Sequence, residues 1–209
     1  MKTKTEPLFY FIQRAIRTAA ISAAVIGATA AASVAQADAG VVYTLTNAVS
    51  GNSVAVFNRA DDGTLSPGGQ VATTGLGSGG GLGSQGAIVL SKNGHWLFAV
   101  NAGSNDVSVF SARNGGLTLM SKTSSGGTRP VSLTVRDDLL YVLNGGGVNN
   151  ISGFRIQDNG TLQPIPGSIR PLSAAATGPA QIEFNRDGDE LVVTEKATNK
   201  ISLYSVDNG

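Results

Sequence analysis

One pattern occurs four times along the chain, and this repetition limits the possible folds more than any other feature of the sequence. In each copy a polar residue is followed nine or ten residues later by an aromatic one; the pairs are Asn47 and Phe57, Asn101 and Phe110, Asn144 and Phe154, and Glu195 and Tyr204. The aromatic residues recur after 53, 44 and 50 residues. A period of this length is typical of propeller blades or solenoid units.

The repeats predict β-strands, because β-branched and aromatic residues alternate with small ones and Gly-Asn or Asp-Gly pairs separate the runs. We find no helical periodicity after residue 37. Further strand-like runs precede and follow most copies, so the unit is a four-stranded meander, which is a propeller blade. We therefore predict an all-β propeller with blades at approximately 41–75, 86–125, 129–170 and 178–209.

Stacking of blades explains the repetition, because a single meander cannot bury both of its faces. We expect the recurring aromatic residues to pack between blades. The first copy has no inner strand before it and the last has no outer strand after it. We therefore expect an open arc of about three and a half blades, the N-terminal part of a longer ring, and we expect its uncovered ends to self-associate. A closed four-bladed ring is the alternative.

The first 37 residues have the parts of a secretory signal: a basic start, a small and apolar stretch, and the small-x-small site Ala35-Gln36-Ala37. A membrane anchor is the alternative, but the Ala-rich run is short and weakly apolar for a bilayer of roughly 30 Å. We predict a signal peptide over 1–37, a propeller domain over 38–209, and a periplasmic or secreted bacterial protein that leaves the membrane after cleavage.

Charge and residue usage exclude several classes of function. Removing residues 1–37 takes away four of 15 basic and one of 14 acidic residues, so the net charge changes from +1 to 11 − 13 = −2. We predict no nucleic-acid partner. The chain has no cysteine and one histidine, which excludes disulfides, thiol chemistry and most transition-metal sites. We predict no metal and no cofactor.

The stretches "VVYTLTNAVSGNSVAVFNRADDGTL", "LFAVNAGSNDVSVF", "SGGTRPVSLTV" and "GPAQIEFNRDGDELVVTEKATNKISLYSV" resemble a known family. They are similar to the lactonase-like seven-bladed β-propellers, which are related to propeller-type 6-phosphogluconolactonase and to the carboxymuconate-cyclising enzyme. The resemblance covers nearly all of residues 40–209. It implies an exported hydrolase that opens a sugar or organic-acid lactone.

The resemblance also implies a Gly-Pro-Arg-His motif at the start of an inner strand and a glutamate at the end of the next strand. Here Gly178-Pro179 is followed by Ala180-Gln181, so the arginine and histidine are replaced, while Glu195 stands where the glutamate is expected. Lactone opening needs a base to activate water and a cation or donor to hold the oxyanion. We predict Glu195 as the catalytic residue; the alternative is a solvated charge or a loop ion pair.

The loops that lead into the inner strands and those that join the second and third strands should lie on one face of the propeller, around the central channel, where we expect a small-molecule ligand. On that face we predict that Arg129, Gln181, Lys196 and Asn144 contact the substrate. Arg129 can orient a carboxylate with its planar fork. We expect the asparagines of the repeat to bond chiefly to backbone in their turns.

Two further motifs are given structural roles. Residues 75–86 contain G-x-G-x-x-G twice, but the following "AIVLSKNGHWLFAV" predicts strands and not the helix that dinucleotide binding requires. We interpret this segment as a flexible lid or linker, and His95 as a surface turn residue on the opposite face. A non-enzymatic propeller that binds a ligand or a protein partner remains the alternative function.

Overall fold

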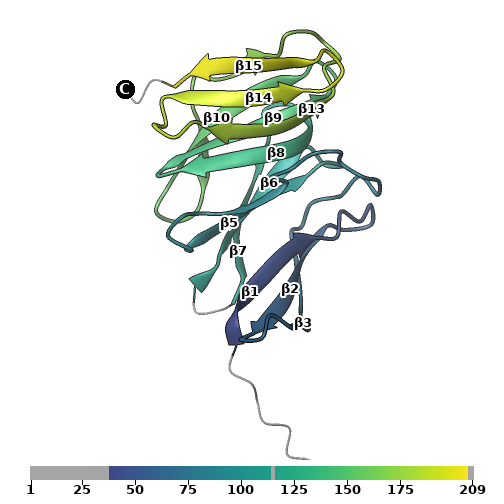
Figure 1. Cartoon of the computed structure of the whole chain (residues 1–209), viewed down its shortest axis with the longest axis vertical. Helices are drawn as coiled ribbons and strands as arrows, with labels where there is room; N and C mark the ends of the chain where they lie inside the picture. Colours follow the sequence, from purple (N-terminus) through teal and green to yellow (C-terminus); the bar gives the residue numbers. More distant parts are fainter. Residues whose placement is uncertain (1–37, 114–115, 207–209) are drawn as a thin grey trace, which may run out of the picture. The chain divides into compact units, whose positions relative to one another are not determined.

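The computed structural model describes residues 38–113 and 116–206, which all belong to one compact unit. These residues form four antiparallel sheets that follow one another along the chain (Figure 1). Among them, no helix is long and apolar enough to cross a bilayer. The predicted all-β architecture is confirmed.

The first two sheets are simple meanders. Blade 1 consists of β1 (Asp38–Leu45), β2 (Ser53–Ala60) and β3 (Leu65–Ala72). Blade 2 consists of β4 (Ile88–Leu90), β5 (Trp96–Asn101), β6 (Asp106–Ser111) and β7 (Thr118–Ser124).

The other two sheets follow the same order. Blade 3 consists of β8 (Thr128–Arg136), β9 (Leu139–Gly146) and β10 (Asn150–Ile156), and its outer edge is shared by β11 (Leu162–Pro164) and β12 (Arg170–Pro171). Blade 4 consists of β13 (Pro179–Phe184), β14 (Glu190–Glu195) and β15 (Lys200–Ser205).

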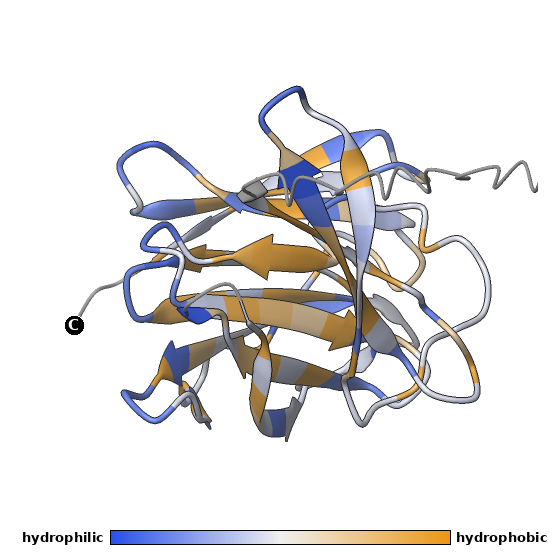
Figure 2. Cartoon of the chain, turned by 90° about the horizontal axis from the view of Figure 1, so that it is seen from below, coloured by the Kyte–Doolittle hydropathy of each residue, from blue (hydrophilic) through white to orange (hydrophobic). Residues whose placement is uncertain are grey.

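Three apolar clusters lie between neighbouring blades, and each recurring aromatic residue packs toward the blade before its own. Phe110 belongs to the cluster between blades 1 and 2, Phe154 to that between blades 2 and 3, and Tyr204 packs against that between blades 3 and 4. In Figure 2 the strands are mainly apolar and many of the connecting loops polar. The prediction that the aromatic residues pack between blades is confirmed for these three.

Burial along the second strand of the meander distinguishes middle blades from end blades; in blade 1 this strand is β1, which pairs with β2 as β5 pairs with β6. Every residue of β9 from Leu139 to Asn144 is buried, as is every residue of β5 after Trp96. In β14 burial alternates, and in β1 partly buried and exposed residues alternate. A strand covered on both faces is continuously apolar, whereas alternation indicates one covered face. The sheets of blades 1 and 4 lie at opposite ends of this unit in Figure 1, and the series does not close into a ring.

Candidate functional site

The C-terminal ends of the second strands hold the polar residue of each repeat in nearly the same position. Asn101 pairs with Asp106 at the end of β5, Asn144 with Asn150 at the end of β9, and Glu195 with Lys200 at the end of β14. In blade 1 the residue in this position is Thr46, whose N–H donates to the Ser53 carbonyl at 3.0 Å. The alignment of Asn47 with this column is therefore wrong by one residue.

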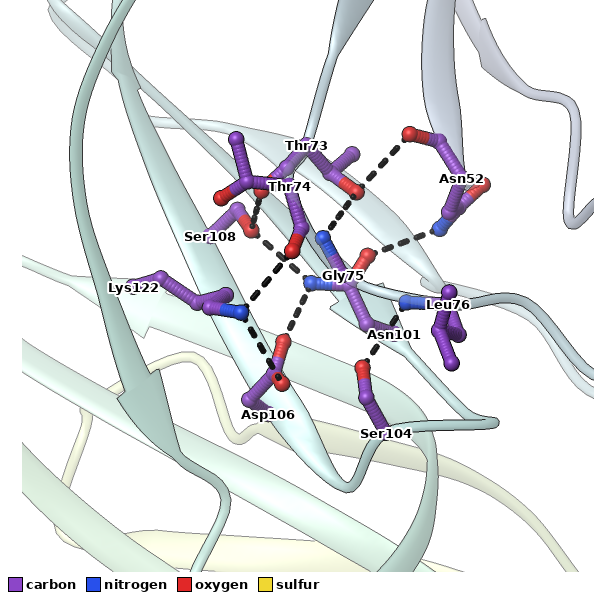
Figure 3. Close-up of polar contacts among 10 residues, drawn as sticks. All are labelled: Asn52, Thr73, Thr74, Gly75, Leu76, Asn101, Ser104, Asp106, Ser108 and Lys122. Carbon is purple, nitrogen blue, oxygen red and sulfur yellow. Dashed lines mark hydrogen bonds and ion pairs between the residues drawn. The ribbon is translucent and has the colours of Figure 1, made fainter. Parts of the chain in front are cut away.

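Asn101 is fully buried and lies at the centre of a polar network (Figure 3). Its amide Nδ2 donates to Asp106 Oδ1 at 2.6 Å and to Ser108 Oγ at 2.8 Å, and its Oδ1 accepts from Asn52 Nδ2 at 2.9 Å. Ser108 in turn donates to the Thr73 carbonyl at 2.8 Å. These hydrogen bonds hold the linker that follows blade 1 against blade 2.

Asn144 makes the corresponding contacts in blade 3. Its Nδ2 donates to the Ser125 carbonyl at 3.2 Å and to Asn150 Oδ1 at 2.8 Å, and Ser152 also donates to the Ser125 carbonyl. Asn144 is buried, and its Oδ1 has no hydrogen-bond partner among the residues that the structure describes. The geometry therefore gives Asn144 a role in fixing a linker, and substrate contact by this residue stays a prediction.

Glu195 is buried with 1% of its surface exposed, and it is neither a solvated charge nor part of an ion pair within the described residues. Its Oε1 accepts from Ser173 N at 3.2 Å and from Ser202 Oγ at 2.6 Å. Its Oε2 accepts from Ser173 Oγ and from Thr198 Oγ1 at 3.0 Å. Four donors occupy the roughly four lone-pair sites of a carboxylate.

The change from asparagine to glutamate reverses the direction of the hydrogen bonds to the linker. In blades 2 and 3 the linkers supply carbonyl acceptors, from Thr73 and Ser125. In blade 4 the linker supplies donors, the N–H and the hydroxyl of Ser173, because an ionised carboxylate can only accept. Glu195 thus replaces the asparagine of the repeat in the same structural position.

Burial raises the pKa of Glu195, but the hydrogen bonds from Ser173, Ser202 and Thr198 outweigh it, so that its pKa lies below the ordinary value. A carboxylate with a lowered pKa is charged at neutral pH and is a weaker base than a free glutamate. As found, this side chain is better suited to holding the loop in place than to removing a proton from water.

Arg129 lies at the start of β8 with a positive φ of 54°, a conformation that L-residues other than glycine and asparagine seldom adopt. Its N–H donates to Asn105 Oδ1 at 2.7 Å. The residue before the proline of the next inner strand, Gly178, has a φ of 56°. Arg129 is half-buried, and its guanidinium makes no hydrogen bond or ion pair within residues 38–113 and 116–206.

The Gly-rich segment 75–86 connects β3 to β4, as the expected linker would, and it makes hydrogen bonds to other segments; its flexibility stays a prediction. Gly77 N donates to the Ala48 carbonyl at 2.8 Å, and Gly79 N to the Asn47 carbonyl at 2.9 Å. A Cβ on Gly77 would lie 2.1 Å from the backbone of Asn47. The glycines here permit close approach of two backbones, which is their role in many loops.

The last part of this segment crosses the inner edges of blades 3 and 4. Ser84 Oγ donates to the Val131 carbonyl at 2.7 Å, and Gln85 N donates to the Ala180 carbonyl at 3.0 Å. Lys196, which follows β14, donates to the Gly83 carbonyl. Lys196 thus contacts this segment directly, and Arg129 lies two residues before Val131, whose carbonyl accepts from Ser84.

Gln181 lies in the middle of β13, and its Nε2 donates to Glu183 Oε2 at 3.3 Å. The next residue, Ile182, is fully buried in the cluster between blades 3 and 4. Because side chains alternate across a strand, Gln181 and Glu183 occupy the face of β13 that is turned away from blade 3. No hydrogen bond within the described residues joins Gln181 to Arg129 or Lys196, and its contact with substrate stays a prediction.

His95 lies in the turn between β4 and β5, exposed as expected, and its N–H donates to Asn93 Oδ1 at 3.0 Å. A cavity of about 720 Å³ lies at this end of the inner strands, beside the turns that follow β4, β8 and β13. Its lining includes the charged residues Lys92, Arg136, Asp137, Glu183 and Arg186. None of the predicted site residues lines it.

Two other positions recur at a fixed distance before the aromatic residue and were not recognised from the sequence. A serine stands two residues before the aromatic residue in three repeats, at Ser108, Ser152 and Ser202. An asparagine stands five residues before it in all four, at Asn52, Asn105, Asn149 and Asn199. The carbonyls of the first three asparagines accept the linker N–H groups of Thr73, Ser125 and Leu172. Both columns are visible once the aromatic residues are aligned.

The family model of the seven-bladed β-propeller lactonases matches residues 34–174. The chain belongs to this lactonase family. No curated protein matches the sequence. The predicted resemblance is therefore confirmed at the level of the family.

Solved structures similar to this lactonase-family chain share its fold at low identity. The periplasmic gluconolactonase of Pseudomonas aeruginosa has a TM-score of 0.62 and 18% identity, over 81% of this chain and 52% of that one. A proposed 6-phosphogluconolactonase from Bacteroides uniformis has 0.61 and 16%, over 81% and 51%. A protein from Lactobacillus plantarum has 0.63 and 19%, over 80% and 51%. The chain spans about half the length of these structures.

Proposed function

We propose that the protein is an exported lactonase that hydrolyses a sugar or organic-acid lactone. Membership of the lactonase family carries this proposal. The gluconolactonase among the similar structures supports a lactone as the substrate class. The chain spans about half the length of this similar structure, so the activity of the whole protein is part of the proposal.

The cations Arg129 and Lys196 fit the electrostatic part of this reaction. Water attacks the lactone carbonyl and releases a proton to solvent, and negative charge develops on the carbonyl oxygen as the tetrahedral intermediate forms. Collapse of this intermediate breaks the ring C–O bond, and the leaving alkoxide takes up a proton to give the hydroxy acid. The guanidinium of Arg129 has no partner within the described residues, and Lys196 donates to a neutral carbonyl, so neither cation is paired with a carboxylate there. Both can hold the oxyanion or a carboxylate of the substrate.

We assign Glu195 to positioning Lys196, which follows it directly, and not to activating water, because its four donors leave no lone pair free. A general base would impose an acid limb on the pH–rate profile, and Glu195→Gln would remove that limb and lower kcat by at least about a hundredfold. A positioning role predicts a change in KM or kcat with the shape of the profile unchanged. Loss of the acid limb in the variant would return Glu195 to the role of base.

The activity is tested by following acid release from glucono-δ-lactone and from a muconolactone, with the spontaneous reaction subtracted. Replacing Arg129 by alanine should lower kcat/KM by about a hundredfold, the loss expected for one oxyanion donor. Arg136→Ala, at the opposite end of β8 beside the cavity, is the matched control and should leave the rate unchanged. Equal rates in the Arg129 variant and the wild type would contradict the assignment.

The alternative is a propeller that binds a ligand or a protein partner without catalysis. The saturated carboxylate of Glu195 and the replacement of the expected arginine and histidine by Ala180 and Gln181 favour it. Calorimetric binding of a lactone or its ring-opened acid, without turnover of either lactone, would support this function over the enzyme.

Export is tested separately. We expect the exported protein to begin at Asp38, after the small residues at 35 and 37. Intact mass of the periplasmic or secreted protein measures this start. Ala37→Leu should block cleavage because the site requires a small residue there. An exported protein that retains Met1 would contradict the prediction.

A further inference from the structure

The backbone of Arg129 has a conformation that needs support from its surroundings. Its φ of 54° lies in the left-handed region, and Pro130 follows it, which disfavours all but extended conformations in the preceding residue. A strained residue of this kind persists only where neighbouring groups hold it. In the next blade the residue before the proline is Gly178, which adopts a φ of 56° without such strain. An arginine in the same place indicates a role for its side chain.

Asn105 of blade 2 supports this conformation from the neighbouring sheet. Its Oδ1 accepts the N–H of Arg129 at 2.7 Å, although the two residues are 24 positions apart. Asn105 lies in the loop between β5 and β6, where its N–H donates to the Asn101 carbonyl at 2.9 Å and its carbonyl accepts from Ser125 N at 2.9 Å. The amide oxygen of Asn105 is therefore held in place at the start of β8.

Gly146 of β9 leaves room for the side chain of Arg129. A Cβ on Gly146 would lie 2.9 Å from the Arg129 Cβ, closer than such atoms approach in proteins. Gly146 has no positive φ, so glycine is required here for space and not for backbone conformation. In blade 4 the two residue types are exchanged: a Cβ on Gly178 would lie 3.3 Å from Ala197, which follows the polar residue of the repeat by two positions, as Gly146 does. Only blade 3 has the side chain on the inner strand.

We propose that Asn105 and Gly146 are positioning residues, which hold Arg129 in the orientation that the reaction needs. Asn105 fixes the main chain of Arg129, and Gly146 makes room for its Cβ, so together they set the direction in which the side chain leaves β8. The guanidinium has no partner within the described residues, so its position depends on the main chain. Misplacement of a reacting group by about 1 Å can lower a rate by about a hundredfold. The inference rests on the proposed lactonase function, in which Arg129 holds the oxyanion or a carboxylate of the substrate.

A double-mutant cycle in the full-length protein tests the contact between Gly146 and Arg129 without requiring turnover. Gly146→Ala should lower the midpoint of urea unfolding by about 0.5–1 M, because the new Cβ overlaps that of Arg129. In Arg129→Gly the same change creates the pair found in blade 4, and the midpoint should fall by about half as much or less. The remaining loss arises from Thr128, whose Cγ2 would lie 3.1 Å from the added Cβ. Equal shifts in the two backgrounds would overturn the inference.

The rate of lactone hydrolysis tests whether Asn105 acts through Arg129. Asn105→Gly removes the amide acceptor and permits the φ of 60° at this position. It should lower kcat/KM by about ten- to a hundredfold in the wild type. In Arg129→Ala it should have no further effect, because no guanidinium is left to position. A second loss of the same size in that background would show a general loosening of the site and would overturn the inference.

Asn159→Gly is the matched control for Asn105→Gly. Asn159 Oδ1 accepts the N–H of Thr161 at 3.0 Å in the turn after β10, at the opposite end of that strand from the loop after β9. Removing this acceptor should leave kcat/KM unchanged. A wild type that hydrolyses neither glucono-δ-lactone nor the muconolactone would contradict the proposed function, and with it a role of Asn105 and Gly146 in catalysis. An active wild type with an uncoupled urea cycle would contradict the present inference alone.

Discussion

At the scale of single residues, Glu195 shows that one substitution within a repeat requires its neighbours to change. Asn144 donates to a linker carbonyl, and Asn101 donates to Ser108, which in turn donates to a linker carbonyl. Glu195 instead accepts from Ser173 in the linker. A buried charge is tolerated only where hydrogen bonds replace its lost hydration. The three hydroxyl donors and the N–H around Glu195 provide that replacement, which explains a buried carboxylate without a cation.

The lowered pKa of Glu195 predicts how stability depends on pH. Ionisation of Glu195 stabilises the fold above the ordinary glutamate range, and this contribution is lost as the pH falls through the lower, folded-state pKa. In Glu195→Gln, the pH dependence should be weaker, and the free energy of unfolding at pH 7 should fall by about 1–3 kcal/mol, because the amide donor opposes other donors. Urea denaturation from pH 3 to 7 measures both effects.

Glu183→Gln is the matched control for this prediction, because Glu183 is exposed and its carboxylate accepts only from Gln181 within the described residues. This control should keep the pH dependence of the wild type. Identical pH profiles for the wild type and Glu195→Gln would contradict the assignment of the lowered pKa to Glu195.

Arg129 predicts a trade-off between stability and activity. A non-glycine residue with left-handed backbone costs about 1–2 kcal/mol, and glycine avoids this cost but gains entropy in the unfolded chain. Arg129→Gly should therefore unfold with a free energy equal to the wild type or up to about 1 kcal/mol higher, and yet lose lactonase activity. Parallel denaturation and turnover assays measure the two. A variant that is much less stable would show that the guanidinium packs structurally.

At the scale of the elements, each linker between blades is held by a close approach to the next blade. A Cβ on Gly75 would lie 2.3 Å from the Asn101 side chain, and one on Gly127 would lie 2.6 Å from that of Asn144. Real Cβ atoms do not approach other atoms so closely, so either alanine must displace the buried asparagine. Both positions therefore require glycine because a side chain has no room there, and not because of the backbone conformation, since neither residue has a positive φ.

Gly127→Ala should lower the free energy of unfolding by about 1–3 kcal/mol, the usual cost of overpacking a buried site. Gly81→Ala is the matched control, because a Cβ there meets nothing within 4 Å and its φ is not positive. Urea denaturation of the two variants measures the difference. Equal stability would show that the linker shifts away from Asn144 without cost.

The strands and the blades could be predicted from the sequence, because the aromatic residues recur wherever a side chain is buried between neighbouring sheets. The polar residue of blade 1 was misplaced, since the loop after Thr46 is one residue longer than the corresponding loop of blade 3 and two longer than those of blades 2 and 4, so that Thr46, and not Asn47, stands in that position. The burial of Glu195 could not be predicted, because its donors Ser173, Thr198 and Ser202 come from three separate segments. The binding of residues 75–86 across two later blades depends on contacts distant in sequence.

At the scale of the whole unit, each blade is stabilised by its neighbours, so stability should differ along the series. Blade 3 supplies buried residues to two of the three apolar clusters, through Leu143 and Leu140, whereas blade 1 supplies one to a single cluster, through Val54. In arrays of this kind, stability is approximately a sum of unit and neighbour terms. A blade covered on one face should therefore open more easily than one covered on both.

We expect hydrogen exchange to be fastest in blade 1 and slowest in blade 3. All but one of the residues of β3 are exposed, whereas β9 is buried from Leu139 to Asn144. Amides of β1 to β3 should open by local fraying, with a lower free energy than the amides of β8 to β10, whose exposure requires the loss of two clusters. Mass spectrometry of peptides after exchange, with protein concentrations low enough to keep the chain monomeric, measures this order. Uniform protection across the four sheets would contradict this expectation. It would mean that the unit opens only as a whole and that contact with a single neighbouring blade does not lower the free energy of opening of blade 1.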